Sequence, residues 1–206
     1  MICRAPESVR EDQVNPWFGK GVLLAGLVAT IAIRAPHDTV SKNTPVTENR
    51  RGPLEVVLLA LMMIGTLLLP VLSLTPLLAF ADYPLHPVAL GAGVAVMLLA
   101  LWLFHRSHAD LGKNWSMTLE IREGHELVTG GVYARIRHPM YTALYLYGLA
   151  QALLLANWLA GLSFLVAFTL MFAARLRSEE RMMLEKFGEK YEDYRRRTKR
   201  LVPFVW

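Results

Sequence analysis

The feature that most constrains this fold is a run of 36 residues, Pro139 to Ala174, that carries no formal charge. Two further uncharged stretches, Val56 to Ala81 and Tyr83 to Phe104, come before it. A helix needs roughly 20 apolar residues to cross the hydrocarbon core of a bilayer. The amphipathic surface helices of a soluble protein would instead present polar side chains on every turn. The lengths of these runs therefore predict an integral membrane protein with an all-α fold.

The apolar runs divide into about five transmembrane helices. We expect them at about Trp17–Ile33, Leu54–Leu74, Pro87–Phe104, Tyr141–Ala156 and Leu159–Ala174. The 36-residue run is too long for one crossing and just long enough for two short ones, so a tight helical hairpin over 139–174 should turn at Asn157 and Trp158. Pro70 favours a bend in the second span. The uncharged core of the first span is short, and Lys20 lies near its edge, where a lysine side chain can reach the interface.

The chain after the hairpin predicts a C-terminal helix over 175–197, because this segment has no proline and a single glycine, Gly188. Four side chains share one face of this expected helix: Met183, Phe187, Tyr191 and Tyr194. The chain thus divides into an N-terminal region, residues 1–104, with three spans, and a C-terminal region, residues 105–206. The second region consists of a long connection, the hairpin and the C-terminal helix.

Positive charge is distributed as expected for a membrane protein. The chain is 54% hydrophobic and 19% charged, whereas soluble domains average about 25% charged residues. The net charge of +5 comes from Lys and Arg in alternate loops and in the tail, which has ten basic and six acidic residues between Arg175 and Arg200. The positive-inside rule then predicts an outside N-terminus and a cytoplasmic C-terminus, and it accounts for the basic residues without a nucleic-acid partner. A single cysteine, Cys3, excludes an intrachain disulfide.

Side chains able to support chemistry gather in the connection, residues 105–141, and at the start of the tail. The connection is long for a loop but too apolar to be disordered, so it should pack against the spans and the tail. Gly130-Gly131 permits a tight turn. Pro139 opens the fourth span, since proline at the first helical position leaves no N–H unpaired. His138 precedes it, and taken alone this histidine either faces the interface or serves a function.

Several motifs of this region occur in a fixed order. Residues 137–141 read Arg-His-Pro-Met-Tyr, and residues 127–133 read Leu-Val-Thr-Gly-Gly-Val-Tyr. The remaining motif residues are Leu111-Gly112, Trp115-Ser116, Glu179-Glu180, Phe187-Gly188, Tyr191, Tyr194 and Pro203. From about Leu111 to Pro203, a little under half of the chain, this pattern resembles the isoprenylcysteine carboxyl methyltransferase family.

The resemblance implies a membrane methyltransferase that uses S-adenosylmethionine, with residues 105–206 as its catalytic region and its site on the cytoplasmic side. The residues at the family's cofactor-binding positions are His125, Glu126, Leu127, Val128, Tyr133, His138, Pro139, Met140, Tyr141 and Glu179. Arg175 matches the position that contacts the acceptor and is the implied catalytic residue. Animal members have glutamine where this chain has Thr118, so Thr118 is left out of the site. The implied acceptor is a lipophilic small molecule or lipidated substrate, such as a prenylcysteine-like carboxylate, and no metal ion is implied.

The chemistry of these residues suits S-adenosylmethionine, which has an ammonium, a carboxylate, a sulfonium and an adenine. Glu179 can pair with the ammonium, and His138 can hydrogen-bond the carboxylate. Tyr133 or Tyr141 can stack on the adenine or face the sulfonium, while Leu127 and Val128 can offer backbone groups and apolar walls. Methyl transfer is an in-line displacement, so the enzyme mainly aligns the reactants and excludes water. A carboxylate or thiolate acceptor needs no general base, whereas an amine or protonated thiol does.

Each residue also has a plainer interpretation. Tyr133 and Tyr141 can be interface anchors, and Arg175 can be a snorkelling helix end. Glu179 can pair with Lys186 or Arg175, and His125 and Glu126 can be solvated loop residues. Trp115 can be a packing or interface residue, and residues 195–200 can form a basic helix on anionic lipid. Three other functions also remain open. One is an NADPH-dependent membrane reductase related to the much longer sterol reductases. The others are a thiol or lipid-amine methyltransferase of the same fold, and a scaffold without activity.

Overall fold

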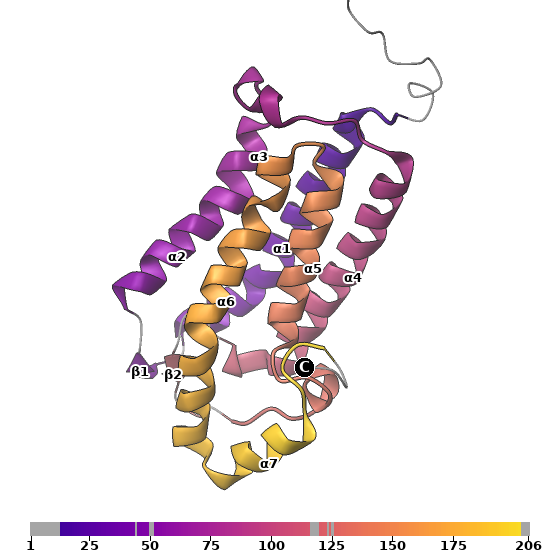
Figure 1. Ribbon diagram of the computed structural model, residues 1–206. Coiled ribbons are helices and arrows are strands. Elements are labelled where there is room, and N and C mark those ends of the chain that lie inside the picture. The colour runs from indigo at the N-terminus through magenta and orange to yellow at the C-terminus, as the bar shows by residue number, and fades with distance from the viewer. Residues whose placement is uncertain are drawn as a thin grey trace, which may run out of the picture.

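A computed structural model describes residues 13–43, 45–49, 52–115, 120–122, 124 and 126–202. The chain forms a bundle of helices, with a long connection between α4 and α5 (Figure 1). The helices are α1 (Pro16–Asn43), α2 (Pro53–Met63), α3 (Leu69–Leu72), α4 (Pro87–Leu111), α5 (Pro139–Leu154), α6 (Trp158–Phe187) and α7 (Glu189–Arg197). Two short strands, β1 (Val46–Asn49) and β2 (Glu120–Arg122), pair antiparallel near one end of the bundle. The predicted helical membrane fold is confirmed, and the structure adds this strand pair and three 3-10 helices, Pro76–Ala81, Gly112–Asn114 and Gly131–Ala134.

Proline marks the beginning of four of the helices. Pro16, Pro53, Pro87 and Pro139 are the first residues of α1, α2, α4 and α5. A proline ring fixes φ near its helical value, and its missing N–H is one that no helix would pair in its first turn. The sequence rule applied to Pro139 therefore holds at each of these helix starts.

Four segments are long and apolar enough to cross a membrane. They are Pro16–Thr39, Pro53–Leu72, Pro87–Leu111 and Trp158–Phe187. These segments contain the first, third and fifth of the expected spans, and they contain the second except for its last two residues. Helix α5 lies between α4 and α6 (Figure 1) but has 16 residues, which is about 24 Å of helix. A complete crossing by α5 therefore remains a prediction.

The expected hairpin is formed by α5 and α6, which run antiparallel with a short turn between them (Figure 1). Asn157 makes this turn: its Oδ1 accepts a hydrogen bond of 2.9 Å from the Ala160 N–H and so caps α6. The Nδ2 group of Asn157 donates to the Leu78 carbonyl at 2.8 Å and to Asp82 at 2.7 Å. The turn is thereby tied to the connection between α3 and α4. Trp158 is already the first residue of α6.

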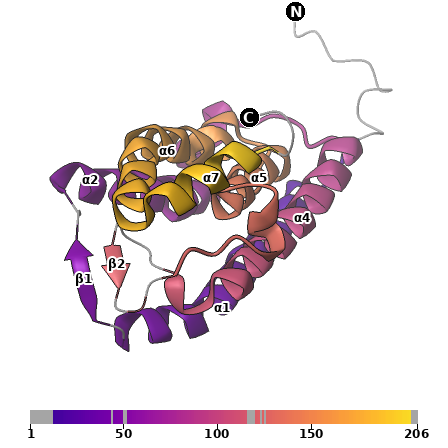
Figure 2. The ribbon, with the colours of Figure 1, turned by 90° about the horizontal axis from the view of Figure 1, so that it is seen from below.

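Two helices continue beyond their predicted ends. Helix α4 extends to Leu111 and not to Phe104, and α6 runs through Arg175 as far as Phe187. The separate C-terminal helix over 175–197 is therefore wrong. Charged residues end the apolar run but not the helix, since Arg, Glu, Lys and Met all have high helix propensity. Gly188, with φ of +54°, breaks the helix, and the nine residues of α7 follow in a new direction (Figure 2).

The second span contains an irregular turn before Pro70. Residues Ile64–Leu68 form a π-helical turn between α2 and α3. Proline at position 70 cannot donate the backbone hydrogen bond that a regular helix would require, and a π turn is one way to absorb such a defect. The bend expected at Pro70 stays a prediction, and the π turn lies just before that proline. At Gly65 an added Cβ would lie 2.9 Å from the Phe164 backbone, so α6 packs closely against this turn.

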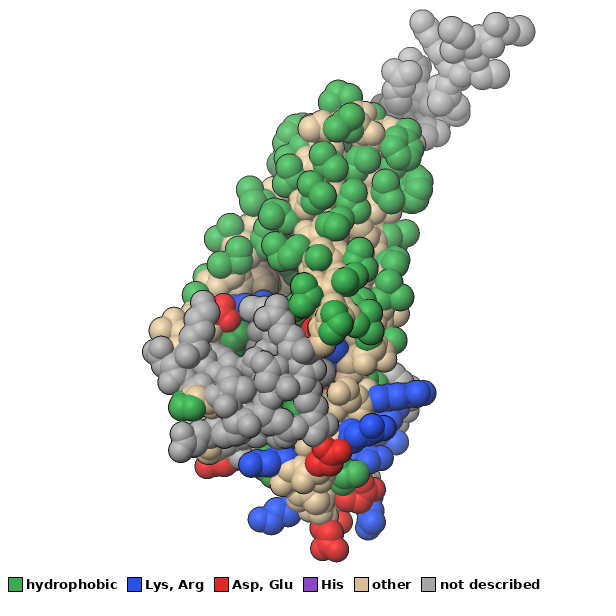
Figure 3. Space-filling model, turned by 90° about the vertical axis from the view of Figure 1, so that its left-hand side faces the viewer, with side chains coloured by type: hydrophobic (Ala, Val, Ile, Leu, Met, Phe, Trp, Pro, Cys, Tyr) green, Lys and Arg blue, Asp and Glu red, His purple; other side chains and the backbone are tan. Residues whose placement is uncertain are grey.

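The outer surface separates into an apolar and a charged part. Large apolar side chains are exposed along the bundle, among them Phe18, Val28, Leu98, Trp102 and Val166. In Figure 3, hydrophobic side chains cover the upper part of the molecule, while Lys, Arg, Asp and Glu gather at the lower end. Exposed apolar surface of this extent suits lipid and not water. The charged end is where α5 begins and where α6 and α7 meet.

Candidate active site

Three of the predicted cofactor residues meet at the charged end of the α5–α6 hairpin. His138 precedes the first turn of α5, Tyr141 lies in that turn, and Glu179 extends from α6. The Tyr141 hydroxyl donates a hydrogen bond to Glu179 Oε2. His138 Nδ1 lies 3.6 Å from Glu179 Oε1, and the imidazole stacks on the Tyr141 ring with centroids 5.3 Å apart. The Arg-His-Pro-Met-Tyr motif thus contacts the first carboxylate of the Glu-Glu pair.

The second carboxylate, Glu180, holds the C-terminal segment in place. Arg137 donates to Glu180 Oε1 from Nη2 at 3.0 Å and from Nε at 3.2 Å. Arg200 Nη2 donates to Glu180 Oε2 at 3.3 Å. Arg137 also donates to the backbone carbonyls of Thr198 and Arg195, at 2.5 Å and 3.1 Å. Segment 195–200 is therefore packed on the hairpin at these points, so a basic helix lying only on lipid does not describe it.

The His138 imidazole lies between the carboxylates of Glu179 and Glu180. Its Nε2 is 3.6 Å from Glu180 Oε1, and its backbone N–H donates to the Arg200 carbonyl at 3.0 Å. Burial lowers the pKa of His138, but its contacts with Glu179 and Glu180 outweigh this effect and raise the pKa above the usual value. Nε2 is buried and makes no hydrogen bond within the described residues. The site thus offers a cationic or donor group next to two fixed anions.

Tyr133 is buried beside this cluster and is held at both ends. Its hydroxyl donates to the Ser107 carbonyl at 3.3 Å, and its own carbonyl accepts from the Tyr194 hydroxyl at 2.7 Å. Burial raises the pKa of Tyr133. Because the side chain is 7% exposed, an interface anchor does not describe it. Contact with a cofactor adenine remains a prediction.

The loop before Tyr133 follows the end of α4. The Glu126 N–H donates to Asn114 Oδ1 at 2.8 Å; the Glu126 side chain is exposed, while Leu127 and Val128 are half-buried. His125 lies outside the described residues, as do Thr118 and Pro203. The cluster itself lies at the ends of α5 and α6, so cofactor binding by residues 125–128 remains a prediction.

Pro139 and Met140 connect the cluster to the rest of the connection. Pro139 is buried as the first residue of α5. The Trp115 Nε1–H donates to Met140 Sδ at 3.4 Å, and Trp115 is 3% exposed. His108 lies against the same indole, with ring centroids 5.1 Å apart. The expected packing role of Trp115 is confirmed.

Arg175 does not end its helix at the interface, and its partner comes from the N-terminal half. Nη1 of Arg175 lies 3.5 Å from Oε1 of Glu55, in the first turn of α2. The side chains of Arg175 and Glu55 are 12% and 6% exposed. The sequence analysis did not single out Glu55. A signal for it was present, since Glu55 directly precedes an uncharged run of 26 residues. An ionisable group at a membrane helix is unfavourable there unless it is paired or functional.

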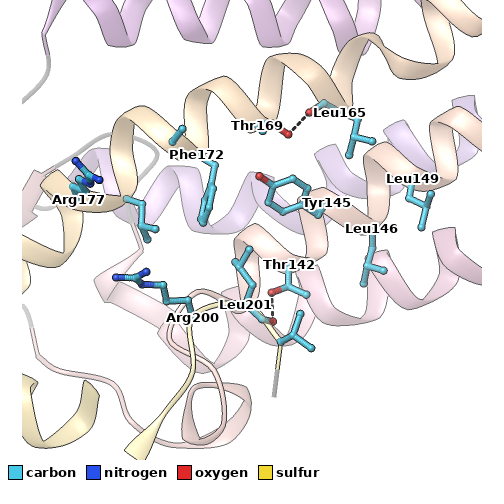
Figure 4. A pocket seen from close by; sticks show the side chains of 13 residues that line it. Thr142, Tyr145, Leu146, Leu149, Leu165, Thr169, Phe172, Arg177, Arg200 and Leu201 are labelled. Carbon is cyan, nitrogen blue, oxygen red and sulfur yellow. Dashed lines mark hydrogen bonds between the residues drawn. The ribbon is translucent and has the colours of Figure 1, made fainter. Parts of the chain in front are cut away.

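A groove of about 960 Å³ opens between α5 and α6. Figure 4 shows its apolar wall, which includes Leu146, Leu149, Leu165 and Phe172, with Arg177 and Arg200 at one end. Phe172 also touches the cluster, since its ring centroid is 5.6 Å from that of Tyr141. The Tyr141 ring therefore lies between this wall of the groove and Glu179.

The part of the chain that forms this site is similar in sequence to known proteins. Residues 91–185 match the family described as the isoprenylcysteine carboxyl methyltransferase (ICMT) family. The protein-S-isoprenylcysteine O-methyltransferase of Schizosaccharomyces pombe is 31% identical over 115 residues, which are 54% of this chain and 49% of the relative. Protein-S-isoprenylcysteine O-methyltransferase B of Arabidopsis thaliana is also 31% identical, over 55% of this chain and 58% of the relative. The chain spans about half the length of these relatives.

The human protein-S-isoprenylcysteine O-methyltransferase is 34% identical over 86 residues, or 42% of this chain and 30% of the relative. Among solved structures, the eukaryotic intramembrane Ras methyltransferase ICMT superposes with a TM-score of 0.51 at 28% identity. That superposition covers 73% of this chain and 50% of the solved one. Sequence and fold thus agree that residues 91–185 are similar to proteins of the isoprenylcysteine carboxyl methyltransferase family.

Proposed function

We propose that this chain is an integral membrane enzyme that transfers a methyl group from S-adenosylmethionine to a lipophilic acceptor, such as a prenylcysteine-like carboxylate. The observation that carries the proposal is the contact of His138 and Tyr141 with Glu179. It brings the Arg-His-Pro-Met-Tyr motif and the Glu-Glu pair together in one half-buried cluster. We place the catalytic region at residues 105–206 and its site, with the C-terminus, on the cytoplasmic side.

The residues of the cluster fit the methyl donor. Glu179 provides an anion for the ammonium group, and Tyr141 and His138 hold that carboxylate in position. His138 Nε2 is buried without a hydrogen bond among the described residues and lies at the start of α5, where a carboxylate is favoured. The Tyr141 and Tyr133 rings can face the sulfonium or the adenine. When bound, S-adenosylmethionine supplies an electrophilic methyl group.

The acceptor side of the site would include Arg175. A guanidinium can hold both oxygens of a carboxylate, which orients one of them for attack. A carboxylate acceptor needs no general base, so the protein's task is alignment and exclusion of water. The groove between α5 and α6 can take an apolar chain, because its wall is mostly apolar and includes Phe172, whose ring also contacts Tyr141. The NADPH-dependent reductase is not favoured, because the relatives are named as methyltransferases.

A methylation assay with membranes that contain the chain tests this function directly. With methyl-labelled S-adenosylmethionine and an N-acyl-S-prenylcysteine, label should enter the acceptor as a base-labile ester. Arg175→Ala should lower turnover or raise the KM for the acceptor and leave cofactor affinity nearly unchanged, whereas His138→Ala should weaken cofactor binding. Loss of cofactor binding in Arg175→Ala with retention in His138→Ala would reverse these two roles.

A further inference from the structure

The groove between α5 and α6 matches one leaflet of a bilayer in length. Leu165 and Arg177, which both line the groove, lie twelve residues apart on α6, and this separation is about 18 Å along a helix axis. One leaflet contributes roughly 15 Å of hydrocarbon to a bilayer. The groove therefore extends from the charged end of the bundle over about the depth of one leaflet.

The wall of the groove presents mainly apolar groups, among them Leu146 and Phe172 (Figure 4). Two threonines also belong to the wall, but their hydroxyls are already bound to the backbone. Thr142 donates to a carbonyl of the segment after α7, and Thr169 donates to a carbonyl one turn earlier on α6, both at 2.8 Å. These hydroxyls therefore require no polar partner from an occupant, and an acyl chain suits this wall.

Two arginines border the charged end of the groove, one from α6 and one from the segment after α7 (Figure 4). Arg177 is exposed, and its guanidinium makes no ion pair or hydrogen bond within the described residues. The Arg200 side chain is 36% exposed and is held by Glu180, with Nη2 3.3 Å from Oε2. Glu180 also accepts from Arg137 at 3.0 Å, so its carboxylate is already paired. A phosphate at this end would meet two guanidiniums, whose planar donors suit its oxygens.

We propose that this groove binds an anionic phospholipid, with an acyl chain along the wall and the phosphate at Arg177 and Arg200. A basic helix end that only attracts the membrane surface requires no groove, and a groove for a neutral chain requires no arginines. The choline of a zwitterionic lipid would bring a cation to the same two arginines, so a net anionic lipid is favoured.

The bound lipid also regulates access to the enzyme, because it competes with the acceptor. This competition rests on the proposed function, which places the acceptor's apolar chain in the same groove. The lipid site itself depends only on the groove and its two arginines.

Native mass spectrometry of the detergent-solubilised protein, titrated with lipids, measures the site without an activity assay. We expect phosphatidylglycerol to bind about fivefold more tightly than phosphatidylcholine with the same acyl chains, and Arg177→Gln to reduce that preference to about twofold or less. Arg181→Gln is the matched control and should keep the preference, since Arg181 is exposed one turn later on α6 but does not line the groove. Thr169→Trp should weaken the binding of both lipids, because the indole fills the groove.

Equal binding of the two lipids by the wild type would overturn the inference, as would an unchanged preference in Arg177→Gln. An equal loss in Arg181→Gln would also overturn it, because the charged end would then attract anionic lipid without a site in the groove. Displacement of the lipid by an equal concentration of glycerol 3-phosphate, which has no acyl chain, would assign the arginines to a free phosphate compound.

Nanodiscs of varied composition test the competition. A higher fraction of phosphatidylglycerol should raise the KM for the acceptor and leave kcat unchanged. A lower kcat at constant KM would overturn the competition. Absence of methylation with an intact lipid preference would overturn the proposed function and leave the lipid site standing.

Discussion

His138 lies between two carboxylates, so part of the stability it contributes depends on pH. Burial lowers its pKa in the folded protein, but Glu179 and Glu180 outweigh this effect and raise it. Such a group stabilises the fold fully below its unfolded pKa of about 6.5, and the contribution is lost as the pH rises through the higher folded pKa.

We therefore expect His138→Gln to lower the Tm of the detergent-solubilised protein more at about pH 6 than at about pH 9. Thermal unfolding at both pH values measures this difference. A deficit that is the same at both, or larger at the higher pH, would show that the imidazole is not protonated in the cluster.

Glu180 has a structural role that differs from that of its sequence neighbour Glu179 and is visible only in the fold. It pairs with Arg137 and Arg200, and its side chain is 10% exposed. Glu180→Ala would leave the buried Arg137 without its anion, so we expect the unfolding free energy to fall by about 3 kcal/mol. Glu192→Ala is the control: its exposed pair with Arg195 should cost about 1 kcal/mol or less. Chemical denaturation curves of equal stability for the two variants would contradict this assignment.

The sequence predicted the members of the cluster better than their contacts. His138, Tyr141 and Glu179 were recognisable because family motifs retain their order along the chain. The contact of His138 with Glu179 and the clamp around Glu180 depend on how α5 and α6 pack, which no local pattern contains. Glu55 was missed because its partner lies 120 residues away in sequence, on a different helix.

Among the structural elements, the groove between α5 and α6 can be tested as the binding site for the acceptor's apolar chain. Thr169 lines it, whereas Val166, on the same helix, is 59% exposed and is not among its lining residues. An indole at position 169 would displace at least two methylene groups of a bound chain, each worth about 0.8 kcal/mol. We expect Thr169→Trp to raise the KM for a long-chain acceptor about tenfold and to affect a short-chain acceptor much less.

Val166→Trp places the same indole on the lipid-facing surface and should change neither KM. Steady-state kinetics with the two acceptor lengths measure the effect. Equal KM values for Thr169→Trp and Val166→Trp with the long chain would mean that the acceptor binds elsewhere.

Helix starts were predicted more accurately than helix ends. Prolines at positions 16, 53, 87 and 139 fix the starts through a local steric rule. The ends of α4 and α6 were placed where the apolar runs stop, but hydropathy reports the membrane boundary and not the helix boundary. Helix α6 continues for 13 residues past Ala174 because its charged residues still favour helix, and Gly188 ends it.

For the whole molecule, the distribution of charge predicts which end faces the cytoplasm. Leu77, in the connection between α3 and α4, is 69% exposed at one end of the bundle, and the Arg196 side chain is 71% exposed at the other. In a Cys3→Ser background, Leu77→Cys should react with a membrane-impermeant maleimide in intact cells. Arg196→Cys should react only after the membrane is permeabilised. Labelling of both from the same side would contradict the proposed topology.

We expect the cluster of His138, Tyr141 and Glu179 to bind S-adenosylmethionine. Calorimetric titration of the purified protein tests this binding, with Glu179→Gln and the exposed Glu189→Gln as a matched pair. The first substitution keeps the shape of the site and removes the charge that meets the ammonium group. We expect the wild type and Glu189→Gln to bind with equal affinity, and Glu179→Gln to lose about 1.5–3 kcal/mol, which is roughly a 10- to 150-fold increase in Kd. Equal affinity in all three proteins, or binding of NADPH in place of S-adenosylmethionine, would contradict the account.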